Sequence, residues 1–141
     1  MTNQGFIITS LILILFVSTP AQSELVIIGN SKTVFSELNT RIISRIYTGK
    51  IIEIEGISVI PINSTQTTTL RNKFLEKYLS QDENEYSAYW TVRRFIGKGT
   101  PPKELASVTD IINYVGETPG AIGYIDTDSI SVPNSVKIIN Q

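Results

Sequence analysis

Two turns punctuated by glycine constrain the fold of this chain more than any other feature. One is Gly-Lys-Gly-Thr-Pro-Pro at residues 97–102, and the other is Thr-Pro-Gly-Ala-Ile-Gly-Tyr at residues 118–124. Each turn follows a segment whose apolar residues recur at helical spacing, and each leads into a loop or a strand. Helices and strands that alternate in this way predict an α/β fold with a central mixed sheet and helices packed on its faces.

The N-terminal segment is expected to direct export. Residues 6–17 form an apolar run without a charged residue, which is shorter than the about 20 residues that a membrane-spanning helix needs. Small residues follow, so we predict a signal peptide over residues 1–21, with cleavage after Ala21 or Ser23. Because residues 1–5 contain no Lys or Arg, an uncleaved N-terminal anchor is the alternative. Export would place the domain of residues 24–139 in the periplasm.

Composition excludes several kinds of chemistry. The chain has no cysteine and no histidine, so it has no disulfide and no Ser-His or Cys-His nucleophile. A hydrolase built on carboxylates alone is the remaining enzymatic alternative, and no acidic motif supports it. The net charge is −1 and no basic run is present, so we expect no nucleic-acid partner. We therefore expect a non-enzymatic protein with no cofactor and no metal.

The apolar pattern predicts eight elements in the order β-α-β-α-α-α-β-β. Ser36 is the expected N-cap of the first helix and Asp82 that of the third. Tyr86, Tyr89, Trp90 and Phe95 have a spacing that favours a core position over a stacking platform. The expected strands are 24–29, 57–62, 121–125 and 136–139, and the expected helices are 36–47, 70–79, 82–97 and 107–115.

The best local candidate for a binding site is the polar loop of residues 63–69, which joins a strand to a helix start. Free backbone amides at a helix N-terminus, together with hydroxyl donors, make an anion site, and an Arg in the first turn adds a bidentate grip on an oxyanion. In the alternative, one Thr caps the helix and the other side chains are solvated. The predicted ligand-binding residues are Ser64, Thr65, Thr67, Thr68 and Arg71.

A second positive cluster contains Arg93, Arg94 and Lys98. Arg93 and Arg94 point about 100° apart on a helix, so a solvated face is the alternative to a binding site. The amides of Gly97 and Gly99 would allow a ligand to approach closely, or these glycines simply end a helix.

Taken in order, these segments resemble one lobe of a type II periplasmic substrate-binding protein. The similarity is to the phosphate ABC-transporter substrate-binding family and its short, single-lobe relatives, and it extends over residues 24–139. The segments that carry it are 36–38, 46–50, 59–62, 71–74, 89–90, 95–102 and 118–124.

The resemblance implies helices on both faces of a sheet, an anion held at the helix start after the second strand, and no catalysis. Two departures are visible. The family carries an Asp and a Ser-Gly-Thr run in the loop where this chain has Asn-Ser-Thr-Gln-Thr-Thr-Thr at residues 63–69, and the family closes two lobes around its ligand where this chain has room for one. An open half-site loses the burial that gives small-ligand pockets their affinity.

Two functions follow from this reading. The first is an exported solute-binding domain for phosphate or a similar small oxyanion, with an ABC transporter or another envelope protein as its partner. The second is an interaction module of the cell envelope, derived from a binding-protein lobe that has lost its ligand. In both, the N-terminal segment is the only part expected to meet a membrane.

Overall fold

The computed structural model describes residues 18, 23–33, 35, 36, 38–66, 68–128 and 131–140. The predicted signal peptide at residues 1–21, apart from Ser18, and the predicted ligand-binding residue Thr67 lie outside the described residues. Within the described part of the chain, no helix is long and apolar enough to cross a membrane.

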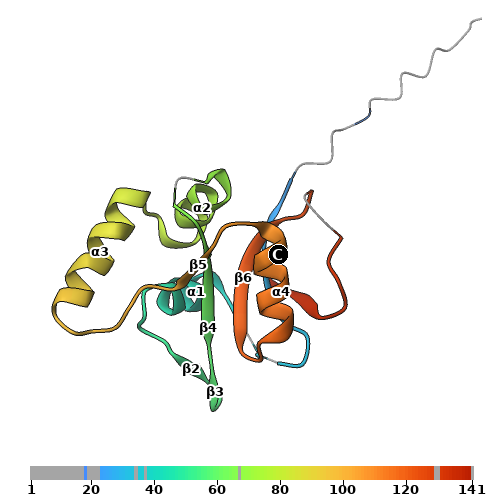
Figure 1. Cartoon of the computed structure of the whole chain (residues 1–141), viewed down its shortest axis with the longest axis horizontal. Helices are drawn as coiled ribbons and strands as arrows, with labels where there is room; N and C mark the ends of the chain where they lie inside the picture. The colour runs from blue at the N-terminus through green and yellow to red at the C-terminus, as the bar shows by residue number, and fades with distance from the viewer. Residues whose placement is uncertain are drawn as a thin grey trace, which may run out of the picture.

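A five-stranded mixed sheet forms the centre of the molecule, in the order β5-β4-β6-β1-β7 (Figure 1). β4 runs parallel to both β5 and β6, whereas β1 is antiparallel to β6 and β7. The carboxyl ends of β4, β5 and β6 therefore share one edge of the sheet, which is where ligands bind in open α/β sheets. The strands are β1 (Leu25–Asn30), β4 (Ile60–Ser64), β5 (Lys103–Leu105), β6 (Ala121–Asp126) and β7 (Val136–Asn140).

Helices cover both faces of the sheet, as predicted. Because side chains alternate along a strand, Val26 and Ile28 of β1 pack with α4 (Val108–Glu117), and Leu25 and Ile27 pack on the opposite face. Figure 1 shows α4 and α3 on opposite sides of the sheet. The second face is covered by α1 (Thr40–Tyr47), α2 (Thr69–Phe74), the π-helical turn η1 (Leu75–Leu79) that continues α2, and α3 (Glu83–Phe95).

Of the two predicted N-caps, one is correct and one is wrong. Asp82 caps α3 and forms a reciprocal capping box with Glu85. Ser36 does not cap α1, because Asn39 accepts a hydrogen bond from the amide of Ile42 and starts the helix there. The Ser36 hydroxyl instead donates to the Glu55 carboxylate.

The expected strand at residues 57–62 is wrong as one element. A short hairpin of β2 (Glu53–Ile54) and β3 (Ile57–Ser58) precedes β4. The sequence pattern also missed β5, which begins directly after Pro101 and Pro102 and pairs in parallel with β4. A strand of three residues at a sheet edge is too short to give an alternating pattern.

The prediction that Phe95 lies in the core with Tyr86, Tyr89 and Trp90 is wrong for Phe95. Tyr86 and Trp90 are buried, whereas the Phe95 side chain is 92% exposed. Tyr86 and Trp90 are four residues apart on one side of α3, and Phe95 comes five residues after Trp90, in the last turn, where α3 extends past the body of the protein (Figure 1).

Candidate functional site

The predicted loop begins at the buried end of β4. Asn63 and Ser64 are 1% and 4% exposed. The hydroxyl of Tyr124, on β6, donates to Asn63 Oδ1 at 2.5 Å and accepts a hydrogen bond from the Ser64 amide at 3.0 Å. The neighbouring strand therefore fixes the backbone at the point where the loop leaves the sheet.

Two of the predicted hydroxyl groups bind each other. Thr68 is the N-cap of α2, and its Oγ1 accepts a hydrogen bond from the Arg71 amide at 3.2 Å. The Thr68 hydroxyl donates to the carbonyl of Thr65 at 3.1 Å, so the Ser64 hydroxyl, 3.0 Å away, is the donor to Thr68 Oγ1. Both hydroxyl protons are used inside the loop, and Thr65 keeps a half-buried side chain beside them.

Arg71 is the most enclosed charge of the described chain, at 2% exposure. Its Nε and Nη2 donate to the two carboxylate oxygens of Glu83 at 2.6 and 2.7 Å. Its Nη1 donates to Glu104 Oε1 at 2.6 Å and to the carbonyl of Ser64 at 2.9 Å. A guanidinium has five N–H groups, so one is left over, and two carboxylates balance its charge.

These partners keep Arg71 charged. Burial by itself lowers the Arg71 pKa, but the hydrogen bonds and charges of Glu83 and Glu104 outweigh it, and the net pKa is raised. The predicted first-turn Arg therefore joins α2 to α3 and β5. Sequence reasoning missed both carboxylates because they lie 12 and 33 residues away along the chain, and the second is on the strand that the pattern did not reveal.

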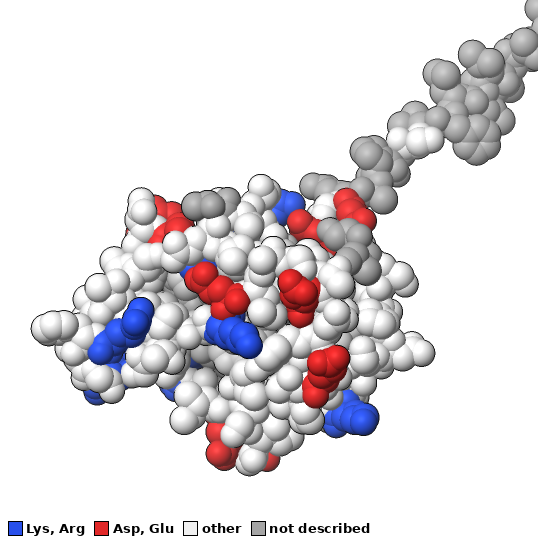
Figure 2. Space-filling view, viewed as in Figure 1, with Lys and Arg blue, Asp and Glu red and all other residues white. Residues whose placement is uncertain are grey.

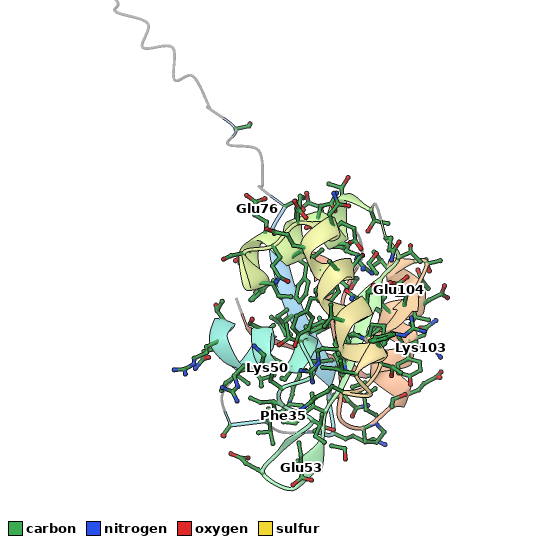
Figure 3. The ribbon with its side chains drawn as sticks, turned by 90° about the vertical axis from the view of Figure 1, so that its left-hand side faces the viewer. Phe35, Lys50, Glu53, Glu76, Lys103 and Glu104 are labelled. Carbon is green, nitrogen blue, oxygen red and sulfur yellow. The ribbon has the colours of Figure 1, made fainter. Side chains whose placement is uncertain are left out.

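A hollow of about 130 Å³ opens beside this loop. It brings the loop residue Gln66 and Arg71 together with Arg94, which is exposed and lies within salt-bridge distance of no acidic residue in the described part of the chain. Figure 3 looks onto α3 and labels Glu104 beside it. The hollow is lined by Gln66, Arg71, Tyr86, Ser87, Trp90, Thr91, Arg94, Pro101 and Glu104.

Hydrogen bonds between buried tyrosines connect the wall of the hollow to β4. Tyr86 donates to the carbonyl of Tyr47 at 2.8 Å, and Tyr47 donates to the carbonyl of Ile62 at 3.0 Å. Burial raises the pKa of Tyr86 to about 12 and raises the pKa values of Tyr47 and Tyr124 as well. All three phenols are therefore neutral at physiological pH and act as hydrogen-bonding groups of the scaffold.

The second positive cluster does not come together as one site. Arg94 lines the hollow, whereas Arg93 Nη2 donates to the carbonyls of Gly49 and Lys98 at 3.4 and 3.1 Å. The amide of Lys98 bonds back to the carbonyl of Arg93 at 2.8 Å, with Gly97 at a φ of 73°. Gly97 therefore ends α3, as the simpler alternative expected.

A larger hollow, of about 800 Å³, lies where β6 ends and β1 begins. Its two cations are already engaged. Lys73 Nζ lies 3.3 Å from Asp126 Oδ2, and Lys77 Nζ donates to the carbonyl of Leu25 at 3.1 Å. With Glu24 and Glu76 also in its wall, this hollow is less suited to an anion than the one beside Arg94. The described residues contain no cluster of three metal-ligating side chains.

No protein-family model and no curated protein matches the chain. Solved structures do match it. A protein from Clostridium perfringens assigned to the phosphate ABC transporter substrate-binding proteins, and solved with bound phosphate, is 18% identical with a TM-score of 0.64. The match covers 83% of this chain and 44% of that one.

Two further solved structures agree. PstS from Borrelia burgdorferi is 14% identical with a TM-score of 0.61, and the match covers 84% of this chain and 47% of that one. An ABC-type phosphate transport receptor from Vibrio cholerae is 16% identical with a TM-score of 0.57, over 83% of this chain and 45% of that one.

The fold is that of a periplasmic binding protein. The chain spans less than half the length of these relatives, which corresponds to one lobe of the predicted kind. At these identities the similarity establishes the fold, and the ligand has to be argued from the site itself.

Proposed function

We propose that this chain is a non-enzymatic solute-binding lobe that holds a small oxyanion such as phosphate beside the β4–α2 loop. The observation that carries the proposal is the convergence, on one hollow of about 130 Å³, of the loop residue Gln66 with the unpaired Arg94 of α3. A tetrahedral oxyanion is small enough for such a hollow.

The donors in this proposal differ from those that the sequence favours. Ser64 and Thr68 build the loop, since their hydroxyl protons are internally bonded. Arg71 lines the hollow and offers one remaining N–H. Thr65 does not line the hollow and stays in the proposed set by its position in the loop. Arg94 then supplies the positive charge that Glu83 and Glu104 cancel at Arg71. Thr67 belongs to the proposed set by its position in the loop.

Glu104 is the residue that we expect to make the site select phosphate over sulfate. The loop has no carboxylate of its own, but the Glu104 side chain is 36% exposed and lies in the wall of the hollow. A carboxylate accepts a hydrogen bond from a protonated oxyanion and repels one that is fully ionised. Phosphate near neutral pH carries a proton and sulfate does not, so we expect phosphate to bind more tightly than sulfate.

Titration calorimetry with phosphate, and with sulfate as the control anion, tests the proposal. The informative variants are Arg94→Gln and Gln66→Ala, because neither side chain has a structural bond within the described protein that its loss would break. Arg41→Gln, at an exposed position on α1, is the matched control. A wild-type protein that is folded and gives no heat with phosphate contradicts the proposal.

The solved relatives support a partnership with a transporter. They are named as ABC-transporter receptors, and an exported lobe of this fold would deliver its ligand to an ABC transporter of the same envelope. Export itself rests on the signal peptide predicted for residues 1–21.

An interaction module of the cell envelope is the second candidate function. The observation that favours it is the internal use of Arg71, Ser64 and Thr68, which leaves fewer free donors than the sequence suggests. In this case phosphate gives no heat, and Arg94→Gln changes neither ligand binding nor stability.

A further inference from the structure

The C-terminal end of α3 presents an apolar surface that no described residue covers. Val92, Phe95 and Ile96 are 59%, 92% and 56% exposed. Their spacing of three and four residues places them on one side of the last turns of α3. We call these three residues the apolar tip. Figure 1 shows this end of α3, and the turn that follows it, at the edge of the molecule farthest from α4.

The surroundings of the apolar tip are positively charged. Residues 86–103 contain Arg93, Arg94, Lys98 and Lys103 and no acidic residue, although the whole chain has a net charge of −1. Arg93 Nη2 binds the carbonyls of Gly49 and Lys98, which brings the turn before Lys50 up to the same end of α3. Figure 3 shows Lys50 and Lys103 on the two sides of this helix, and Figure 2 shows Lys and Arg atoms on the side of the face where α3 lies.

We propose that the apolar tip and its cations dock this lobe on an anionic membrane surface. Apolar side chains on one side of a helix enter the headgroup region, and Lys and Arg beside them bind anionic lipids. The tip is convex, with Phe95 almost fully exposed, and a bilayer accepts such a shape without a matching pocket. A protein partner would need an acidic pocket of complementary form. No residue of the apolar tip lines the hollow, although the neighbouring Arg94 does. The variants used to test the docking proposal therefore leave Arg94 in place, so that its failure is distinguishable from failure of the oxyanion site.

Flotation of the protein with vesicles tests the proposal. The vesicles are phosphatidylcholine alone and phosphatidylcholine mixed with phosphatidylglycerol. The protein is expected to float with the mixed vesicles and not with phosphatidylcholine alone. Phe95→Ser is expected to weaken the partition by about tenfold, and the double variant Lys50→Gln/Lys98→Gln by about tenfold or more.

Two control variants distinguish binding through the apolar tip from non-specific binding through any exposed apolar or charged side chain. Ile138→Ser removes an exposed apolar side chain from β7, at the edge of the sheet opposite β5, and Lys32→Gln removes an exposed charge from the turn after β1. Both are expected to float like the wild type. Because Phe95 is exposed, Phe95→Ser should keep the wild-type unfolding midpoint, which excludes a folding defect.

Three results would overturn the proposal. The first is no flotation with either vesicle. The second is equal flotation of wild type and Phe95→Ser. The third is a photocrosslinker at position 95 that joins one acidic protein while the vesicles stay unbound, which would assign the tip to a protein partner.

Discussion

Arg71 and Glu83 form a bidentate ion pair between α2 and α3, with donor–acceptor distances of 2.6 and 2.7 Å and an arginine that is 2% exposed. Removing the guanidinium leaves the carboxylates of Glu83 and Glu104 without the cation that balances them. We expect Arg71→Ala to lower the free energy of unfolding by about 3–5 kcal/mol. Urea unfolding followed by circular dichroism measures this loss.

Glu104→Gln is the comparison for that prediction. Its side chain is 36% exposed and shares Arg71 with Glu83, so we expect a cost of about 1 kcal/mol or less. If Arg71→Ala costs no more than Glu104→Gln, the arginine does not hold the two helices and the strand together.

Because three tyrosines are buried, we expect the free energy of unfolding to fall at alkaline pH. Burial raises the pKa values of Tyr47, Tyr86 and Tyr124, with Tyr86 at about 12, whereas an unfolded tyrosine ionises near 10. The unfolded chain therefore loses protons first as pH rises, and the stabilisation is present below pH about 10 and is lost between about 10 and 12. The measurement is the unfolding midpoint as a function of pH.

Tyrosinate absorbance gives an independent check of the same groups. The chain has six tyrosines, and those with raised pKa values should ionise only as the protein unfolds. A smooth titration of all six near pH 10, with the fold intact, would show that the three phenols are not buried.

Substitution by alanine is expected to cost more stability at Gly120 than at Gly97, although both glycines adopt a positive φ. Both have positive φ, at 82° and 73°. A Cβ at Gly120 would overlap the carbonyl oxygen of Ser58, whereas one at Gly97 meets nothing within 4 Å. We expect Gly97→Ala to cost about 1 kcal/mol from backbone strain alone and Gly120→Ala to cost about 3 kcal/mol or more. Equal costs, measured by urea unfolding, would contradict the close approach of Ser58.

Helix capping predicts a smaller effect at Asp82. Its Oδ1 accepts a hydrogen bond from the Glu85 amide at 2.9 Å, and Glu85 Oε2 accepts one from the Asp82 amide at the same distance. Asp82→Ala should cost about 1 kcal/mol, and Asp82→Ser should keep most of the stability. A serine variant as unstable as the alanine variant would mean that the charge, rather than the cap, is what matters.

Much of this fold is readable from local pattern. Asp82 and Ser107 mark helix starts through their own side chains, and the largely apolar segments at residues 25–30 and 121–125 are buried on both faces of the sheet. β5 was not readable, because three residues after two prolines carry no period. Phe95 was misplaced because a helical pattern does not reveal that a helix extends beyond the body it packs on.

The candidate site was only partly predictable, for a physical reason. The sequence indicates which residues leave β4 and start α2, and Thr68 does cap that helix. It does not reveal that Glu83 and Glu104 converge on Arg71, since such pairs form only when the chain folds. The sequence pattern does not distinguish Arg94 from Arg93 as a binding residue. In the structure Arg94 lines the hollow, whereas Arg93 binds the carbonyl of Gly49.

The central claim is that a small oxyanion binds beside the β4–α2 loop with Arg94 as its available cation. Titration calorimetry of the folded protein with phosphate, repeated with Arg94→Gln and with the control Arg41→Gln, tests it most directly. We predict phosphate binding that exceeds sulfate binding, is weakened about tenfold by Arg94→Gln, and is unchanged by Arg41→Gln. No heat with phosphate would contradict oxyanion binding. Binding that Arg94→Gln leaves intact would contradict this position for the site.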